Sequence, residues 1–273
     1  MDQILLPTTI EFLDSDIPNV GRVVITPCHQ GYGTTIGNAL RRVLLSSLPG
    51  AAVESVKIDG IQHEFSALAG VEEDVVEILL NFKQLAVRSF SSAPVKLSLI
   101  KKGIGDILAA DIEKNSDVEI INPKLKIATL TNKNIEVRLE ITIGQGRGYV
   151  PASEKDTRGW DLGMIALDSL YTPIRDVGYD VEMTRVGDVT DYEKLIVTVA
   201  TNGTITPKTA INQAVRMLID HFSLLAEKAS DEGAQTSELF LESNESAVGA
   251  ADSLTEGDEI KKTSRKKKKK LVT

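Results

Sequence analysis

Three consecutive acidic residues are the first group in this sequence that could do chemistry. Glu72, Glu73 and Asp74 could hold a divalent cation or act in acid–base catalysis. Consecutive helical residues point in different directions, however, and acids at the start of a helix complement its dipole. Because apolar residues follow at helical spacing from Val75, we interpret the three acids as the first turn of a helix over residues 71–84.

A glycine-rich stretch, Gly144-Gln-Gly-Arg-Gly-Tyr-Val-Pro151, invites comparison with a loop that cradles phosphate. It lacks the Gly-Lys-Ser/Thr ending of such loops. Pro151 also stands where the N-terminus of a phosphate-binding helix should begin. We therefore interpret the stretch as a strand that ends in a glycine-rich surface loop.

The remaining reactive residue types are few and scattered. Cys28 is the only cysteine, which excludes an intrachain disulfide and a cluster of thiolate ligands. His29, His63 and His221 lie far apart in the sequence and follow no metal-ligand spacing. We predict no catalytic residue, no metal and no cofactor for this chain.

Composition indicates a cytoplasmic protein with an unusual end. The 273 residues carry a net charge of −8, contain no apolar run long enough to span a bilayer, and do not begin like an export signal. Residues 227–259 hold ten acidic residues and one lysine, whereas residues 261–270 hold eight basic residues and no acid. The mildly acidic remainder does not favour a protein that grips nucleic acid over a broad basic face.

The elements that must organise the chain begin with a predicted helix over residues 31–48, which Thr34 or Thr35 would cap and Pro49-Gly50 would end. One side is an ordinary core stripe. The other side places Leu45 among Asn38, Arg41 and Arg42, which is either a solvated face or a second dry face for another chain. The core stripe consists of Ile36, Ala39, Leu40, Val43, Leu44 and Ser47.

A second helix is predicted from Thr206-Pro207, a cap followed by proline at the first helical position, to about residue 228. It carries two apolar stripes, so we expect one side to pack on a sheet and the other on a symmetry mate. The first stripe is Ile211, Val215, Leu218, Phe222 and Leu225, and the second is Ala210, Met217 and Leu224.

Short alternating runs predict strands over much of the remaining chain, largely antiparallel. The residues alone thus indicate an α+β protein that forms a dimer. The predicted strands lie within residues 4–27 and at 51–58, 61–65, 95–100, 104–109, 118–121, 127–130, 135–143, 178–185 and 192–200.

Several long motifs carry more information than the local patterns. They are Gly31-Tyr-Gly-Thr-Thr-Ile-Gly-Asn-Ala-Leu-Arg-Arg-Val-Leu-Leu-Ser-Ser-Leu-Pro-Gly50 with its continuation to Val53, the stretches 58–66 and 70–83, Gly146-Arg-Gly-Tyr-Val-Pro-Ala152, and Thr201-Asn-Gly-Thr-Ile205. In sequence and in order these motifs resemble those of the bacterial-type RNA polymerase alpha-subunit family, and the resemblance runs from about residue 8 to residue 228.

The resemblance implies a fold that local patterns do not show. It implies an α+β protein with a discontinuous dimerisation subdomain, formed by an antiparallel sheet and two helices, and an inserted mainly-β subdomain. By this resemblance, residues 1–52 and 177–228 form the dimerisation subdomain and residues 53–176 form the insert. Residues 229–273 are then a disordered tail, first acidic and then polybasic, as their composition also predicts.

The function implied is scaffolding: two alpha subunits dimerise and bind the beta and then the beta-prime subunit of the polymerase. Omega and sigma would join through the complex, and the nucleotidyl transfer would belong to the large subunits. The resemblance implies that Arg42, Leu45 and His63 contact the beta subunit, although His63 is equally explained as a structural histidine. The positions implied for beta-prime are Lys83, Leu167, Ile174 and Arg175, although a lysine ending a helix is also favoured by the dipole.

The sequence departs from the family at its end. The last residues show no apolar pattern that could form the carboxy-terminal DNA-binding domain usual in the family. A basic run could contact DNA weakly in its place, or could merely aid solubility. Two other classes remain open: a nucleotide-binding enzyme using residues 144–148 and 72–74, and a free-standing DNA-binding regulator acting through its tail. The basic run consists of Arg265, Lys266, Lys267, Lys268, Lys269 and Lys270.

Overall fold

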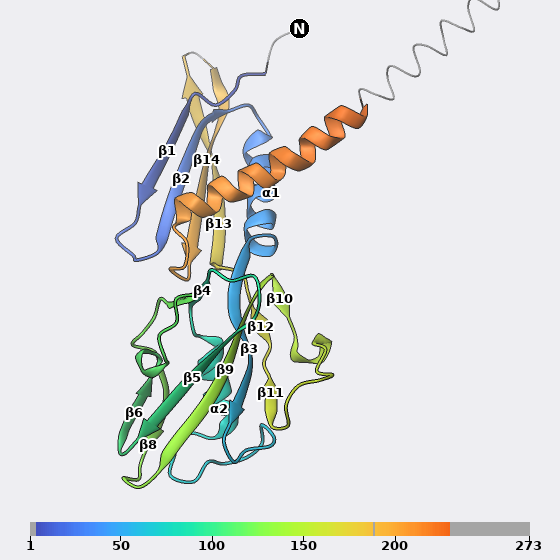
Figure 1. Ribbon diagram of the computed structural model, residues 1–273. Helices are drawn as coiled ribbons and strands as arrows, with labels where there is room; N and C mark the ends of the chain where they lie inside the picture. Colours follow the sequence, from blue (N-terminus) through green and yellow to red (C-terminus); the bar gives the residue numbers. More distant parts are fainter. Residues whose placement is uncertain (1–3, 188, 230–273) are drawn as a thin grey trace, which may run out of the picture. The chain divides into compact units, whose positions relative to one another are not determined.

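The computed structural model describes residues 4–187 and 189–229 (Figure 1). They divide into two compact units between Met217 and Leu218. The first unit holds every strand found in the described residues, and the second continues a helix that begins at residue 207. Of the predicted disordered tail, residues 229–273, Ala229 is helical and residues 230–273 lie outside the described residues.

A four-stranded antiparallel sheet joins the two ends of the chain in sequence. Its order is β1-β2-β14-β13, so β2 from the N-terminal part pairs directly with β14 from the C-terminal part. Along β14, Leu195, Val197 and Val199 alternate inward and are fully buried, as the apolar pattern predicts. The strands are β1 (Thr9–Asp14), β2 (Val20–Cys28), β13 (Ile174–Val186) and β14 (Val189–Thr201).

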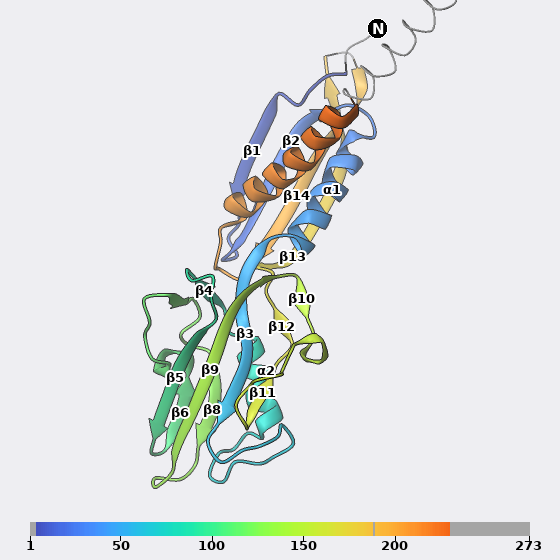
Figure 2. The same ribbon diagram turned by 45° about the vertical axis from the view of Figure 1, so that its right-hand side comes forward.

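Helix α1 (Tyr32–Ser46) lies against β13 and β14 (Figure 2). Its buried residues are Gly33, Gly37, Leu40 and Leu44, so two glycines belong to the contact stripe that the sequence assigns to larger residues. A Cβ atom at Gly37 would lie 2.7 Å from the Cδ2 atom of Tyr179. The glycines therefore let the helix backbone approach the sheet closely.

The N-terminus of α1 is capped differently from the prediction. Gly31, with φ 86°, is the capping residue, and the Thr35 hydroxyl donates to the Gly31 carbonyl instead of accepting from the first turn. The cap comes from β14: each Glu193 carboxylate oxygen accepts a hydrogen bond of 2.8 Å, one from the Gly31 N–H and one from the Gly33 N–H. The threonine caps were wrong because the acceptor lies 160 residues away in the chain.

Between α1 and β13 the chain forms the mainly-β part of the first unit. A six-stranded sheet has the order β5-β9-β3-β4-β7 with β11 added to β3, and β6-β8 and β10-β12 form two small pairs. The elements are β3 (Pro49–Ile58), α2 (Val75–Lys83), β4 (Val87–Ser89), β5 (Val95–Lys102), β6 (Gly105–Leu108), η1 (Ala109–Asp111), β7 (Val118–Ile120), β8 (Lys126–Leu130), β9 (Glu136–Arg147), β10 (Tyr149–Val150), η2 (Ala152–Glu154), β11 (Met164–Ala166) and β12 (Ser169–Leu170).

Helix α2 covers this core with the predicted apolar stripe but begins later than predicted. Asp74 is its N-cap, and its carboxylate accepts from the Glu77 N–H at 2.8 Å. Glu73 precedes the helix and is buried, where its carboxylate accepts from the Thr129 N–H and hydroxyl. The placement of Glu72 and Glu73 in the first helical turn was therefore wrong. The stripe Val75, Ile78, Leu79 and Phe82 is buried, which confirms that part.

Two predicted segments differ in backbone conformation. Residues 61–65 form turns and irregular chain instead of a return strand. The glycine-rich stretch continues β9 to Arg147, and Gly144 and Gly146 pair there with Ala52 and Gly50 of β3. The predicted surface loop is therefore a paired strand, because its glycines make room for neighbouring side chains such as the Tyr171 ring.

The helix over residues 207–229 begins as predicted, since the Thr206 hydroxyl accepts from the Thr209 N–H at 3.2 Å. Ala210, Ile211 and Ala214 are buried. From Val215 onward, the large apolar residues of the helix are exposed or only half-buried. One part of the predicted apolar surface is thus covered within the chain and another part is not.

Replacing Gly37 with alanine tests the close approach of α1 to the sheet. In an ordinary helix interior this change stabilises by about 1 kcal/mol, but here we expect destabilisation by about 1–3 kcal/mol, because the methyl group overlaps the Tyr179 ring. Urea unfolding at one protein concentration measures the change. Asn38→Ala, on the exposed side of the same turn, is the matched control. A Gly37→Ala protein as stable as its parent would contradict the packing argument.

Candidate partner-binding surfaces

The exposed side of α1 is the first candidate surface, and we call it the α1 outer face: Asn38, Arg41, Arg42 and Leu45. Leu45 is 37% exposed, and the guanidinium groups of Arg41 and Arg42 make no hydrogen bond or ion pair with any described residue. Because Leu40 and Leu44 are fixed in the core, the helix rotation is determined and Leu45 must point outward. The structure therefore brings Arg42 and Leu45 together on one accessible face.

The second candidate surface is a groove of about 410 Å³ beside the end of α2, which we call the Lys83 groove. Two of the sequence-predicted residues, Lys83 and Leu167, line it together. Sequence reasoning missed two other lining residues, Phe65 and Leu80, which are 80% and 50% exposed. The sequence could have indicated Phe65 as a surface candidate, because Phe65 lies within the motif over residues 58–66.

Lys83 is held at the edge of this groove by an ion pair. Its ammonium group donates to the Asp168 carboxylate at 2.7 Å, and the other carboxylate oxygen accepts from the Ala152 N–H at 2.8 Å. The hydrogen bond from Lys83, followed by that from Ala152, holds the pKa of Asp168 below its ordinary value. Lys83 therefore positions the segment after β10 as well as carrying charge at the surface.

A half-buried lysine anchors the same segment. The Lys155 ammonium group donates to the carbonyl oxygens of Glu54 and Leu167 at 2.9 and 2.5 Å and to the Ser169 hydroxyl at 2.6 Å. Burial lowers the pKa of Lys155. Nearby, burial and a hydrogen bond to Glu54 raise the pKa of Tyr171 to about 12. These bonds fix the groove wall to β3.

Ile174, Arg175 and His63 do not line the α1 outer face or the Lys83 groove. Ile174 is only 3% exposed at the start of β13, and Leu167, which lines the groove, is only 2% exposed. Arg175 is exposed next to Ile174. His63 is exposed on the loop after β3, and its ring Nδ1 lies 3.1 Å from the Ser66 hydroxyl. Burial thus separates Leu167 and Ile174 from the residues whose side chains are accessible.

The structure removes the basis for the proposed nucleotide-binding enzyme. Gly144 and Gly146 are paired in β9, Glu73 is bonded to Thr129, and Asp74 caps α2. Within the described residues, no group of three or more His, Cys, Asp or Glu is placed to hold a metal ion. In the same part of the chain, no helix is long and apolar enough to cross a membrane.

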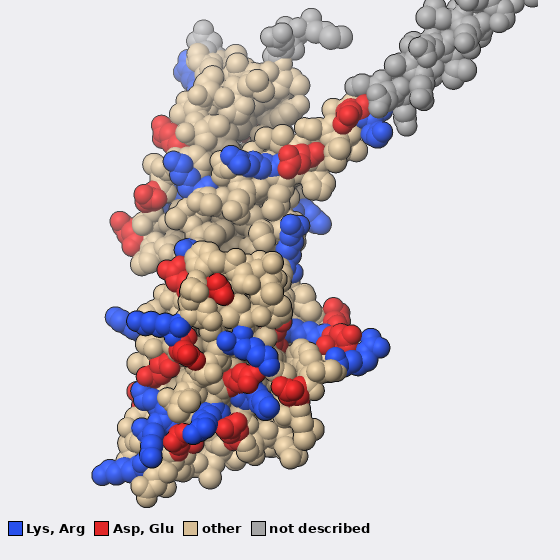
Figure 3. Space-filling view, in the orientation of Figure 1, with Lys and Arg blue, Asp and Glu red and all other residues tan. Residues whose placement is uncertain are grey.

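Charge is mixed over the face seen in Figure 3, where acidic and basic side chains lie close together on the mainly-β part. Ion pairs between accessible side chains of this part include Lys96–Glu140 and Arg88–Glu119. Such a surface is unlike the continuous basic stripe of a nucleic-acid grip. The accessible features are therefore an apolar helix side and two mixed surfaces suited to protein partners.

Comparison with known protein families first defines the class. Residues 56–172 match the model of the RNA polymerase Rpb3/RpoA insert domain, which covers most of the mainly-β part. This match places the mainly-β part in the class of insert domains of RNA polymerase subunits.

Whole-chain relatives then give the particular family. The chain is 51% identical over 211 residues to the DNA-directed RNA polymerase subunit alpha of Symbiobacterium thermophilum, covering 77% of this chain and 67% of the relative. It is 47% identical over 216 residues to that of Alkaliphilus oremlandii, with 79% and 68% covered, and 48% identical over 228 residues to that of Alkaliphilus metalliredigens, with 82% and 72% covered. The chain belongs to the family of bacterial DNA-directed RNA polymerase alpha subunits, the non-catalytic assembly subunits of that enzyme.

Replacing Lys83 with glutamine tests its role in the groove. We expect the pKa of Asp168 to rise toward the ordinary carboxyl value of about 3.9, because its first hydrogen-bond donor is lost. A carboxylate with a lowered pKa stabilises the fold above its unfolded-state pKa, and this contribution disappears as the pH falls through the folded-state value. The variant should therefore have a smaller contribution to lose, and its loss should be complete at a higher pH than in the parent.

Carbon-detected NMR of the Asp168 carboxyl group across the acidic range measures this shift. Lys102→Gln, at an exposed lysine outside the Lys83 groove, is the control and should leave Asp168 unchanged. An unaltered Asp168 titration in Lys83→Gln would show that the ion pair does not form in solution.

Proposed function

We propose that the chain acts as a homodimer that binds the beta and then the beta-prime subunit of RNA polymerase. The observation that carries this proposal is the uncovered apolar side of the helix over residues 207–229. Membership of the alpha-subunit family supports it, and so does the separation of the α1 outer face from the Lys83 groove. In this proposal residues 1–52 and 177–228 serve dimerisation, and residues 53–176 contact the large subunits.

The long helix supports dimerisation because large apolar side chains there lack cover. Exposure is 36% for Val215, 56% for Ile219, 61% for Phe222, 62% for Leu224 and 65% for Leu225. Val215, Ile219, Phe222 and Leu225 share one side of the helix, whereas Leu224 lies on the opposite side. The exposed apolar side that these four residues form is costly in water and marks an interaction site. A second copy offers the same surface, which satisfies the self-complementarity that a two-fold interface requires. On α1, Ile36 and Val43 are half-buried, so part of each side chain stays accessible to a partner.

The α1 outer face supports contact with beta through Arg42 and Leu45. An exposed leucine next to two guanidinium groups without partners in the described residues combines an apolar anchor with donors in fork geometry. His63 belongs to this proposal only as a residue exposed on its loop. Covering Leu45 and pairing Arg42 would remove both features from water in one contact.

The Lys83 groove supports contact with beta-prime. Phe65 and Leu80 supply exposed apolar surface beside the Lys83–Asp168 pair, and Arg175 supplies a further exposed cation. Leu167 and Ile174 act in this proposal by shaping the surface from below, because their side chains are buried. The proposal assigns the chain no cofactor and places it in the cytoplasm, with omega and sigma joining through the complex.

Weak DNA contact by the basic run of residues 265–270 stays a prediction, since these residues lie outside the described part of the chain. The same holds for the expected lack of a carboxy-terminal DNA-binding domain. A free-standing DNA-binding regulator would bind DNA tightly as the purified chain, without other subunits.

Phe222→Asp tests the dimer. A carboxylate in a dry interface lacks a partner and loses its hydration, so we expect the dimer dissociation constant to rise by about 100-fold or more. Analytical ultracentrifugation over a concentration series measures it. Ser223→Asp introduces the same charge at the next exposed position and should leave the dimer intact. A parent chain that stays monomeric at about 1 μM, or equal dissociation constants for the two variants, would defeat the proposal.

Arg42→Ala tests the contact with beta. We expect the dimer to persist while affinity for beta falls by about 10-fold to 100-fold, because a central arginine in an interface contributes strongly. Co-purification of tagged beta with increasing amounts of the alpha variant measures the change. Arg22→Ala, an exposed arginine on β2, is the control. Loss of the dimer in Arg42→Ala would show that the face of α1 is assigned wrongly.

A further inference from the structure

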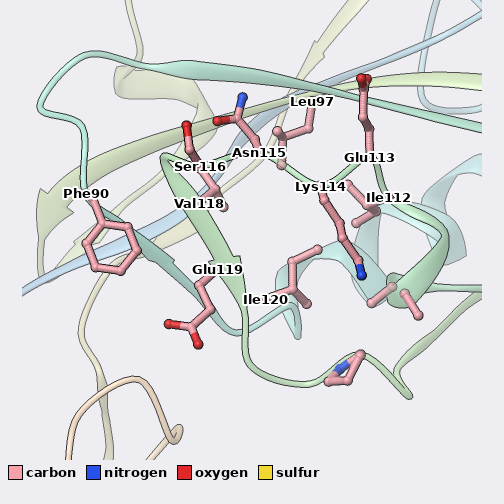
Figure 4. Close-up of a pocket in the computed structure, with 13 residues that line it drawn as sticks. Phe90, Leu97, Ile112, Glu113, Lys114, Asn115, Ser116, Val118, Glu119 and Ile120 are labelled. Atoms are coloured by element: carbon pink, nitrogen blue, oxygen red, sulfur yellow. The ribbon is translucent and has the colours of Figure 1, made fainter.

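A cavity of about 510 Å³ opens in the mainly-β part, at a place that the proposed function does not use (Figure 4). Its floor is formed by Leu97 of β5, Ala109 of η1, Ile112 and Val118, all at most 8% exposed. Ile120 and Pro123 add apolar walls, and the exposed ring of Phe90 lies at one side. None of these residues lines the α1 outer face or the Lys83 groove.

The size and composition of this cavity are those of a site for a small organic molecule. Cavities that enclose most of such a ligand have volumes of roughly 300–1,000 Å³ and mainly apolar linings with a few polar groups. The polar groups here, Asn115, Ser116 and Lys114, come from the loop between η1 and β7. They stand at the rim, above a floor that is already packed against the core.

The charge presented to a ligand is that of Lys114. Figure 4 shows its side chain extending across the cavity beside Ile120, while the Glu113 carboxylate points the opposite way. The Lys114 ammonium group forms no hydrogen bond or ion pair with the described residues. The second carboxylate at the rim, that of Glu119, is bound to the Arg88 guanidinium group at 3.0 Å. Lys114 is therefore the charged group that remains available over the apolar floor.

We propose that this cavity binds a small monocarboxylic acid with an apolar body, such as an aryl or medium-chain alkyl acid. The apolar body lies on Leu97, Ile112 and Val118 and removes their exposed edges from water. The carboxylate pairs with the Lys114 ammonium group, which forms a charge-assisted hydrogen bond. A neutral molecule of the same shape gains the first interaction and lacks the second.

Methyl NMR of the full chain with phenylbutyrate tests the proposal, and the neutral amide phenylbutyramide is the matched control ligand. We expect saturable shifts of the methyl groups of Leu97, Ile112 and Ile120, with a dissociation constant of about 1 mM or below for a ligand of this size. The amide should bind about tenfold more weakly to the same methyl groups, because it lacks the charge.

Three variants then separate the charge from the cavity. Lys114→Gln should weaken phenylbutyrate about tenfold and leave the amide unchanged, whereas Lys114→Arg should keep the preference for the acid. Lys124→Gln removes a nearby exposed lysine that does not line the cavity and should change neither ligand. The same dissociation constant for acid and amide on the parent, or for the acid on the parent and Lys114→Gln, overturns the proposal. The absence of saturable shifts also overturns the proposal, and a protein partner would then be the remaining candidate occupant of the cavity.

Discussion

The capping of α1 by Glu193 is the interaction on which the arrangement of the first sheet depends. A buried carboxylate is costly unless it is paired, and here two backbone N–H groups at the positive end of a helix pair it. The contact requires a glycine at position 33, since a Cβ atom there would lie 2.7 Å from a Glu193 oxygen. It also ties β14, the central strand from the C-terminal part, to a helix from the N-terminal part. The rotation of α1, and hence the outward direction of Arg42 and Leu45, follows from it.

The described residues form a continuous core but leave apolar surface on the remaining elements. Every residue of β1 is exposed, including Ile10 and Phe12, and the helix over residues 207–229 buries only its beginning. Length does not explain this, because the mainly-β part of the same chain buries a large continuous core. The sheet-and-helix frame thus leaves apolar surface that the described residues do not cover, which supports the dimer proposed above. A subunit that assembles other subunits has a physical use for such incompleteness.

Local patterns predicted the elements whose cause is local. The spacing of Val75, Ile78, Leu79 and Phe82 is enough to identify the buried side of α2, and helical rotation alone places Leu45 outward. The errors fall where a distant residue decides. Glu73 lies outside the helix and accepts a hydrogen bond from Thr129, and Glu193 caps α1 in place of the predicted threonine. In the same way, the family resemblance marked Leu167 and Ile174 as surface positions, and only the packed structure shows that both are buried.

The junction between the two parts of the first unit bears on how one sequence could serve two large subunits. Arg88 of β4 donates to the Thr204 carbonyl, ahead of the long helix, and pairs with Glu119 of β7. One side chain therefore holds the mainly-β part to the turn from which the proposed dimer helix starts. Two identical chains joined by two-fold symmetry present every surface twice. If this junction holds in both copies, neither copy refolds at the junction when the enzyme assembles. In the proposed dimer, a difference between the two copies must then come from which surface the first large subunit covers.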